Sequence, residues 1–263
     1  IQERMSLEAE LRRALEADEL SVHFQPKVDC TGKPAGFEAL VRWTSPEFGV
    51  VSPARFIPLA EETGLIGRIT DFVLEASCRE AASWPHRGFG HLRIAVNLSA
   101  SSFKQDDLPQ RIAEVLERTG LAATQLELEI TESLLIGDTQ HTVDILEKLK
   151  VIGVSVAVDD FGTGYSSLAY LKRFPLDVLK IDRSFVTGCE RGGDALAIPR
   201  AIISLGHSLG LKIVAEGVEN EGQLRALEAL GCELFQGFLF SRPLDVRSMH
   251  AYMLDRQAPI RMA

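Results

Sequence analysis

The 263-residue chain lacks the residues and spacings that mark several common classes of protein. Its four cysteines are far apart and form no CxxC pair, so they fit neither a zinc knuckle nor a disulfide framework, and buried free thiols are expected. Its six histidines form no pair at metal-ligand spacing, which argues against a histidine-rich zinc site. No apolar run reaches the roughly 18 residues that span a bilayer, and the charged N-terminus does not resemble a signal peptide. We therefore expect a cytoplasmic chain, or the cytoplasmic part of a larger, membrane-bound protein.

Basic residues are also too few for one class of partner. The net charge of −9 argues against binding to duplex nucleic acid, which needs a basic surface. There is neither a GxGxxG motif after a predicted strand nor a Walker loop, which weakens the nucleotide-binding folds with open sheets. An anionic small substrate is compatible with the charge if metal ions or a few placed cations offset the local field. The hydrophobic content of 46% is ordinary for a globular chain with a large core.

What is present is an alternation of strands and helices. Eight strands are predicted, at Ser21–Gln25, Gly36–Trp43, Leu92–Asn97, Leu126–Ile130, Ser155–Asp159, Val178–Ile181, Lys212–Ala215 and Leu234–Gln236. Helices are predicted near Pro53–Glu62, Ile69–Trp84, Leu108–Thr119, Thr139–Val151, Leu168–Arg173, Ala195–Leu209, Glu221–Leu230 and from about Val246. Pro26 is expected to stop the first strand, and a short turn then predicts an antiparallel first pair. The repeated strand–helix unit favours an α/β fold of the (β/α)8 TIM-like barrel type over an open doubly wound sheet.

The N-terminal segment reads as a separate amphipathic helix. Over residues 2–18, leucines recur at intervals of four with charged residues between them. We therefore divide the chain into a lead-in or linker helix over residues 1–20 and a barrel over residues 21–263. Because the chain begins with Ile rather than Met, we expect that it was excised from a longer protein.

The stretch of residues 151–167 contains two adjacent acids at the end of a buried strand. Apolar alternation up to Val158 indicates the strand, which ends in Asp159 and Asp160 and continues into a glycine-rich loop. Two carboxylates at the mouth of an apolar strand are costly to bury unless positive charge lies beside them. One or two divalent metal ions would supply that charge, and a solvated Asp-Asp turn is the alternative.

Polar side chains end nearly all the other predicted strands. They are Glu38, Asn97, Glu129 with Glu132 just beyond it, Lys180, Glu216 and Gln236. In a barrel of this type the carboxyl ends of the strands meet on one face, where the chemistry takes place. Oxygen ligands favour Mg²⁺ or Mn²⁺ over zinc or copper, and such ions among carboxylates indicate hydrolysis of a phosphate ester. Lys180 is expected to stay protonated and hold the nucleophile, with a structural salt bridge as its alternative role, while Glu216 is a candidate metal ligand or proton acceptor.

The motifs at these positions resemble, in sequence order, those of the EAL family of cyclic di-GMP phosphodiesterases. They are FQP at Phe24–Pro26, EALVRW at Glu38–Trp43, NLS at Asn97–Ser99, ELEITES at Glu127–Ser133, DDFGTGYSS at Asp159–Ser167, LKID at Leu179–Asp182, AEGVE at Ala215–Glu219 and QGF at Gln236–Phe238. Each short motif alone is weak evidence for the family, but their order over residues 5–245 is very specific. The resemblance implies a barrel with one antiparallel strand. It also implies Mg²⁺- or Mn²⁺-dependent hydrolysis of one phosphodiester bond of cyclic di-GMP, which gives linear pGpG.

The resemblance further implies a role for each matching residue. The metal ligands are Glu38, Asn97, Glu129, Asp159 and Asp160, with Asp159 shared between two ions. The catalytic residues are Glu38, Lys180, which holds the attacking water, and Glu216, which acts as general base or as a further ligand. The substrate-binding residues are Arg42 at a phosphate, Gln25 and Leu40 near the guanine end, and Gln236. Calcium is expected to inhibit, because it prefers more ligands at longer distances.

The loop that begins at Asp160 resembles the segment that couples dimerisation to metal binding in this family. The residues assigned to this switch are Glu132, its anchor, with Phe161, Gly162, Thr163, Gly164, Tyr165, Ser166, Ser167 and Glu219. Two glycines would let the loop change conformation, and a rigid spacer is the alternative. The implied partners are a second copy of the chain and an upstream sensory or GGDEF-type domain.

Other functions stay open at this point. Some EAL domains act only as cyclic di-GMP receptors, and others could work as dimeric regulatory modules. Because every expected ligand is present, we favour an enzyme over a receptor. An unrelated divalent-metal barrel, such as an aldolase or an enolase-like enzyme, is compatible with the composition, but the order of the motifs argues against it.

Overall fold

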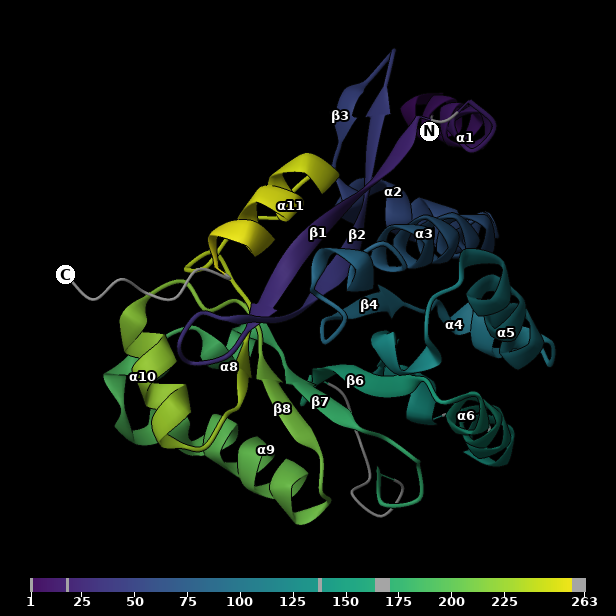
Figure 1. The fold of residues 1–263 in the computed structure, drawn as a ribbon. Helices are drawn as coiled ribbons and strands as arrows, with labels where there is room; N and C mark the ends of the chain where they lie inside the picture. Colours follow the sequence, from purple (N-terminus) through teal and green to yellow (C-terminus); the bar gives the residue numbers. More distant parts are fainter. Residues whose placement is uncertain (1, 18, 137–138, 164–170, 257–263) are drawn as a thin grey trace.

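A computed structural model describes residues 2–17, 19–136, 139–163 and 171–256 as a closed barrel of strands with helices around it (Figure 1). The strands are β1 (Leu20–Val28), β2 (Pro34–Ser45), β3 (Gly49–Val51), β4 (Arg93–Asn97), β5 (Leu126–Thr131), β6 (Ser155–Phe161), β7 (Val178–Ile181), β8 (Lys212–Ala215) and β9 (Leu234–Phe235). Their order in the sheet is β1-β9-β8-β7-β6-β5-β4-β2-β3, and a further pairing of β1 with β2 closes the barrel. The predicted α/β barrel is confirmed.

The helices lie on the outside of this barrel. They are α1 (Gln2–Ala14), α2 (Pro53–Glu62), α3 (Ile66–Ala81), α4 (Ala100–Phe103), α5 (Leu108–Thr119), α6 (Thr139–Ile152), α8 (Arg183–Val186), α9 (Ala197–Ser208), α10 (Glu221–Ala229) and α11 (Val246–Asp255). Short 3-10 helices lie at Pro85–Arg87, Ala123–Gln125, Glu132–Ile136, Cys189–Arg191 and Gly193–Leu196. The short helices α4 and α8 were not predicted, because four residues carry too little of a helical period. Part of the predicted helix Leu168–Arg173 lies outside the described residues. Within the described ranges, no helix combines the length and apolarity needed to cross a bilayer.

Strand β1 runs antiparallel to both of its barrel neighbours, β2 and β9. The prediction that Pro26 stops this strand is wrong, since β1 continues through Pro26, which is paired with Phe37, as far as Val28. Two residues before the proline, the N–H of Phe24 donates to the carbonyl of Leu244, away from β2, at 2.7 Å. Because successive N–H groups alternate sides along a strand, the missing N–H of Pro26 also falls on that side, where pairing with β9 begins only at Val28.

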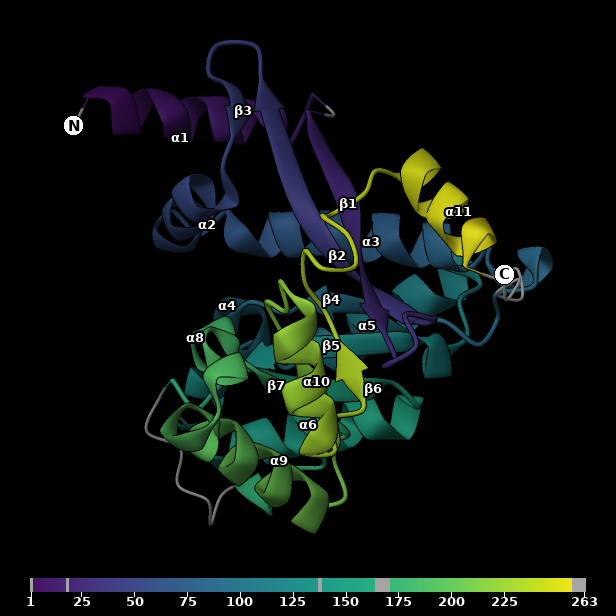
Figure 2. The same cartoon turned by 90° about the vertical axis from the view of Figure 1, so that its left-hand side faces the viewer.

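Strand β2 continues past the rim of the barrel. Its parallel pairing with β4 ends at Ala39, but the strand runs on to Ser45 and turns back into β3. Figure 2 shows this hairpin projecting away from strands β4 to β8, with β1 beside its base. Glu38 was placed at a strand end by the sequence, whereas it lies inside β2, near the end of the part that belongs to the barrel. Strand β3 was not predicted, because three residues are too few to show alternation.

Among the described residues, a small apolar cluster lies on the inward faces of the strands, apart from the main core. It consists of Ala157, Val178 and Val214, with Leu234 partly buried beside them, whereas the main core is a separate cluster that includes apolar residues from helices and strands. Buried polar side chains occupy much of the remaining interior, namely Gln25, Lys27, Glu38, Glu127, Glu129, Lys180 and Gln236. Barrels of this class usually fill the interior with branched apolar residues. Here the interior depends on pairing between charged groups, because an unpaired charge would be very costly to bury.

Helix α1 packs against the barrel rather than standing free. Its residues Leu7, Leu11 and Ala14 are buried, and the helix contacts α2 and β2. Arg4 of α1 also forms an ion pair with Glu62 of α2. The division of the chain at residue 20 into a lead-in helix and a barrel stays a prediction.

We predict that Leu11→Ala destabilises the whole barrel. Leu11 is fully buried, so truncation should lower the free energy of unfolding by about 2–5 kcal/mol. Met5 lies on the same helix and is 66% exposed, so Met5→Ala should change it by about 0.5 kcal/mol or less. Thermal and urea unfolding of both variants measure the difference. Equal melting temperatures for the two would show that α1 does not contribute to the stability of the barrel.

Candidate active site

The ammonium group of Lys180 lies among carboxylates inside the barrel and is completely buried. Its Nζ atom is 2.6 Å from Glu216 Oε1, 2.7 Å from Glu129 Oε2, 3.0 Å from Asp159 Oδ2 and 3.7 Å from Glu38 Oε2. The structure therefore brings together the lysine and four of the acids that the sequence marked. Such a geometry gives Lys180 both the ion pairs of a structural salt bridge and a place at the centre of the site.

The pairing of the strands explains why these side chains meet. Asn97 of β4 lies opposite Glu129 of β5, and Thr131 of β5 lies opposite Asp159 of β6. Alternate residues of a strand point to the same face, so Glu129 and Asp159 both face inward near the carboxyl ends of their strands. Glu216 directly follows β8 and reaches the same place. Rigid strands thus hold acids close together that would otherwise repel one another.

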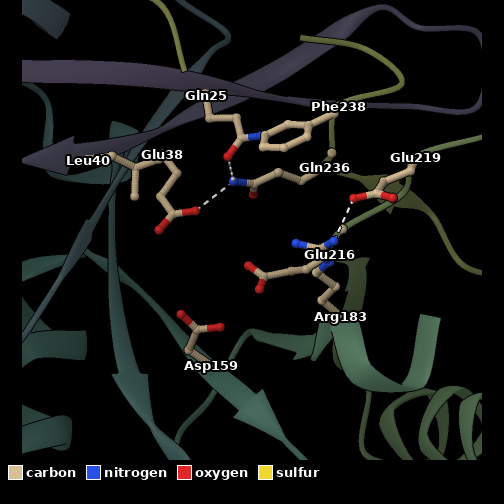
Figure 3. Close-up of a pocket in the computed structure, with 11 residues that line it drawn as sticks. Gln25, Glu38, Leu40, Asp159, Arg183, Glu216, Glu219, Gln236 and Phe238 are labelled. Carbon is tan, nitrogen blue, oxygen red and sulfur yellow. Dashed lines mark hydrogen bonds and ion pairs between the residues drawn. The ribbon is translucent and has the colours of Figure 1, made fainter. Parts of the chain in front are cut away.

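Three amide side chains surround Glu38. Asn97 donates a hydrogen bond from Nδ2 to Glu38 Oε1 at 2.7 Å, and Gln236 donates from Nε2 to Glu38 Oε2 at 2.6 Å. The same Nε2 of Gln236 also donates to Gln25 Oε1 at 3.1 Å, as Figure 3 shows. Among the described residues, the Oε1 atom of Gln236 is buried without a hydrogen-bond partner. Both oxygens of Glu38 are therefore held by amide donors.

Two groups of carboxylates have the spacing that a metal ion needs. Glu38, Glu129 and Asp159 each offer one oxygen within 4.8 Å of the others, and so do Asp159, Asp160 and Glu216. Asp159 belongs to both groups, as expected for a ligand shared between two ions. Asp160 reaches its place through a left-handed backbone conformation with φ of 54°, which is uncommon outside glycine. The donor set consists of oxygens, which suits a hard divalent cation.

Burial and charge shift the pKa values of these acids in opposite directions. Burial raises the pKa of Glu216 to about 8, with Lys180 opposing the shift and Asp159 adding to it. Burial also raises the pKa of Glu38, to which the charge of Glu129 contributes. Burial would raise the pKa of Glu129 too, but Lys180 and Lys27 outweigh it and lower the value to about 2. With a pKa of about 2, Glu129 is ionised at neutral pH, whereas Glu216 has a pKa of about 8.

A pocket of about 220 Å³ opens above these acids. Its lining includes Gln25, Glu38, Leu40, Asp159, Arg183, Glu216, Gly217, Glu219, Gln236, Gly237 and Phe238. Arg183 forms an ion pair with Glu219 at 2.7 Å, and Gly217, with φ of +67°, leaves room for the stem of Arg183, since a Cβ atom there would lie 2.3 Å from Arg183 Cγ. The ring of Phe238 is 46% exposed in the pocket and carries the guanidinium of Arg242 over it at 4.3 Å. The floor of the pocket is anionic, and its walls offer an aromatic ring and a cation.

A second cavity of about 280 Å³ adjoins this pocket and shares Leu40 with it. Arg42 and Asn97 line the second cavity, together with Ser99 and Thr131. Arg42 donates a hydrogen bond to the carbonyl of Val41 at 2.8 Å and is half-buried. The two cavities place the predicted substrate-binding residues on either side of Leu40, with Gln25 and Gln236 in the first and Arg42 in the second.

The start of the predicted switch loop is fixed to its neighbours. Glu132 is buried and accepts a hydrogen bond from the N–H of Gly162 at 2.7 Å, the contact expected of an anchor. Gly162 has φ of +98°, and a Cβ atom there would lie 2.8 Å from the ring of Phe185 in α8. Of the other residues assigned to the loop, Phe161 and Thr163 are described, and Glu219 lies at the pocket with Arg183. The remaining four, Gly164, Tyr165, Ser166 and Ser167, lie outside the described residues.

Sequence reasoning missed several side chains of this region. Arg183 and Phe238 line the pocket, and Lys27 and Glu127 lie beneath it. A signal for the last two was present, because Lys27 follows Gln25 by two residues and Glu127 precedes Glu129 by two, which puts each pair on one face of a strand. Arg183 lies in a four-residue helix and Phe238 in a loop, where no period marks the inward direction.

Fold and site together define a barrel whose strands carry an oxygen-rich cluster suited to divalent cations. The sequence profile described as "EAL domain" matches residues 8–243. The chain therefore belongs to the EAL domain family.

Its similarity to individual proteins is high over nearly the whole chain. "Cyclic di-GMP phosphodiesterase NbdA" of Pseudomonas aeruginosa is 45% identical over 98% of this chain, and "Bifunctional diguanylate cyclase/cyclic di-GMP phosphodiesterase MucR" of the same organism is 46% identical over 95%. The chain spans only 34% and 37% of the length of these relatives. The solved structure "PaMucR Phosphodiesterase, c-di-GMP complex" superimposes with a TM-score of 0.89 at 46% identity, covering 93% of this chain and 99% of that one.

We predict that the metal-free protein loses stability between pH 6 and pH 8.5. A carboxyl group whose pKa rises from 4.5 to about 8 on folding stabilises the folded state below pH 4.5, and this contribution disappears as the pH rises through 8. The contribution of Glu129, whose pKa is about 2, is already complete above pH 4.5 and stays constant over this range. Thermal unfolding in EDTA should therefore show a lower melting temperature at pH 8.5, by about 2–4 °C for each kcal/mol lost.

Glu216→Gln is the matched variant, because it removes this titration and keeps the shape of the side chain. Its melting temperature should fall less between the two pH values than that of the wild type. An identical pH dependence in both proteins would contradict the raised pKa of Glu216.

Proposed function

We propose that this chain hydrolyses one phosphodiester bond of cyclic di-GMP to linear pGpG with the help of Mg²⁺ or Mn²⁺. The observation that carries the proposal is that two clusters of three carboxylates, with Asp159 in both, lie around buried Lys180 beneath an open pocket. Membership of the EAL domain family and the printed activities of two relatives at 45% and 46% identity support the choice of substrate. A relative that binds c-di-GMP in its solved structure, with nearly the same fold, supports it as well.

The charge of the interior supports the binding of two divalent ions. Its carboxylates are Glu38, Glu127, Glu129, Asp159 and Glu216, with the exposed Asp160 next to them, and its ammonium groups are Lys27 and Lys180. When all are ionised, six acids and two lysines leave four negative charges, which two divalent cations would neutralise. Glu38, Asn97, Glu129 and Asp159 would hold the first ion, and Asp159 with Asp160 the second. The ions would supply Lewis-acid charge that polarises the phosphoryl oxygens and makes water a better nucleophile at neutral pH.

Lys180 and Glu216 would handle the attacking water. The three N–H groups of Lys180 lie within reach of Glu129, Asp159 and Glu216 in the structure, so one of them would orient a water molecule once an ion binds its carboxylate partner. Glu216 Oε1 lies 2.6 Å from Lys180 Nζ and can accept the proton that this water loses. A carboxylate that titrates near pH 8 matches the range in which a general base works well.

The two cavities suit the two ends of an extended dinucleotide. Gln25, Leu40 and Gln236 would contact a guanine end in the first cavity, and Arg42 would contact a phosphate from the second. Phe238 lines the first cavity and would offer a ring face for stacking on a base. The proposal includes a cytoplasmic location, a homodimer coupled to the site through the loop after Asp160, and an upstream sensory or GGDEF-type domain.

We predict that Asp159→Asn abolishes turnover without unfolding the protein. The change removes the charge of the one carboxylate that both clusters share. This should cost several kcal/mol of transition-state stabilisation, or at least about a 100-fold loss of kcat. Stability should change little, because the lost ion pair with Lys180 at 3.0 Å is offset by weaker repulsion among the acids of the metal-free cluster. Release of pGpG and thermal unfolding are the measurements.

Asp177→Asn serves as the matched control. Asp177 accepts hydrogen bonds from Lys150 and from the N–H of Val156, outside the pocket. This variant should lower the melting temperature and keep kcat. Parallel losses of activity and stability in Asp159→Asn would remove Asp159 from the ligand set, and binding of cyclic di-GMP without turnover by the wild type would favour a receptor.

We predict that Ca²⁺ inhibits hydrolysis while cyclic di-GMP still binds. Calcium takes six to eight oxygen ligands at about 2.3–2.6 Å, whereas magnesium holds an octahedron at about 2.0–2.1 Å. An ion held at longer distance polarises the phosphoryl group less. Turnover assays in Mg²⁺ with increasing Ca²⁺, and calorimetric binding of cyclic di-GMP in Ca²⁺ alone, measure the two effects. Rapid hydrolysis in Ca²⁺ alone would contradict the proposed role of the ions.

A further inference from the structure

A second buried lysine lies beneath the cluster and holds one of its acids from the other end of the barrel. Lys27 is 4% exposed, and its Nζ atom is 2.6 Å from Glu129 Oε1 and 2.6 Å from Glu127 Oε1. The other oxygen of the same carboxylate, Glu129 Oε2, accepts from Lys180 at 2.7 Å. Glu129, which has no exposed surface, is therefore fixed at both oxygens by two different lysines.

The local sequence explains how a lysine reaches this place. Lys27 follows Gln25 on the inward face of β1, and because β1 runs against its neighbours, the chain passes from the pocket toward the opposite end of the barrel between these residues. Glu127 and Glu129 share the inward face of β5 in the same way. Their partners on the adjacent strands are Ala95 and Ala157, both fully or almost fully buried.

Stability alone does not account for this arrangement. Replacing a buried ion pair or triad by apolar residues of similar volume is often neutral or stabilising, and barrels of this class usually fill the same layer with Val, Ile or Leu. A neutral interior at this level would leave Glu129 with one lysine, on the side of the pocket. The carboxylate could then turn about its last torsion angle, which is broad for glutamate.

We propose that Lys27, held in place by Glu127, is a positioning residue for Glu129. It fixes Oε1 on the side away from the substrate, so that Oε2 stays directed toward Lys180 and the neighbouring acids Glu38 and Asp159. The inference rests on the proposed function, in which Glu129 helps to hold a divalent ion. Lys27 itself does not touch the pocket that would receive the substrate.

The far end of the barrel supplies a matched control. Lys27 and Glu127 line a cavity of about 550 Å³ there, together with Lys212 of β8. Lys212 is exposed, and in the described part of the chain its side chain forms no ion pair. Lys212→Met therefore makes the same chemical change in the same cavity without altering the support of Glu129.

The test compares Lys27→Met with Lys212→Met and the wild type. Calorimetric titration with Mn²⁺ alone, without substrate, gives the dissociation constant of the ion, and initial rates give kcat and KM for cyclic di-GMP. Loss of a group that orients a metal ligand typically costs about 10- to 100-fold in metal affinity or activity. For Lys27→Met, we expect a rise of this size in the Mn²⁺ dissociation constant and in the Mn²⁺ concentration that gives a half-maximal rate. The KM for cyclic di-GMP at saturating Mn²⁺ should stay within about threefold of the wild type. Lys212→Met should match the wild type throughout.

Lys27→Met leaves Glu127 without a cation and Glu129 with Lys180 alone. This imbalance endangers folding, so a second variant restores the net charge. Lys27→Met with Glu127→Gln removes one charge of each sign, keeps the net charge of the interior, and still deprives Glu129 of its lower partner. This double variant should melt close to the wild type and show the same loss of Mn²⁺ affinity. If it binds Mn²⁺ as tightly as the wild type, or if neither variant folds, the positioning role is overturned and the pair serves folding alone.

The same experiment separates this inference from the proposed function. A wild type that neither binds Mn²⁺ nor releases pGpG would refute the proposed function, whatever the variants do. A wild type that does both, alongside Lys27 variants with an unchanged Mn²⁺ dissociation constant, would refute only the role of Lys27.

Discussion

The burial of one ammonium group, that of Lys180, is the constraint on which the site depends. A lysine can lose all contact with water only where carboxylates surround it, and those carboxylates can be buried only where positive charge lies among them. The acids come from different parts of the chain, on or next to β2, β5, β6 and β8. The ion pairs of Lys180 therefore form only when the barrel is closed. Folding and assembly of the site are one event for this reason.

This constraint divides the molecule into two parts with different tasks. The main apolar core joins helices and strands and supplies the burial that drives folding, whereas the apolar cluster inside the barrel is small. The interior is thus available for charged side chains that contribute little to stability and much to the chemistry. Strands hold these side chains more rigidly than loops would, which keeps Glu38 between its amide donors and Asp159 within reach of both carboxylate groups.

The sequence predicted those parts of the fold and site that leave a local pattern. Period-two and period-3.6 apolar patterns located the long strands and helices, and acids that follow apolar runs identified Asp159, Glu129 and Glu216. Features that depend on closure of the barrel left no such pattern. Pro26 looked like the end of a strand because the sequence does not show that its missing N–H falls where β1 has no partner. With the strand ended there, the two-residue spacing of Gln25 and Lys27 could not be read as one face of a strand. Arg183 and Phe238 reach the pocket only through tertiary packing.

The reversed direction of β1 has a consequence for how this chain tolerates change. One short segment carries a residue for the pocket, Gln25, and one for the opposite end of the barrel, Lys27. A single-residue insertion or deletion before Gln25 would let the strand slip by one position, and both side chains would turn outward together while their apolar neighbours turned in. The register of this one strand sets the inward-facing residues at both ends of the barrel. Neither end can therefore change its register, in evolution or by design, without the other.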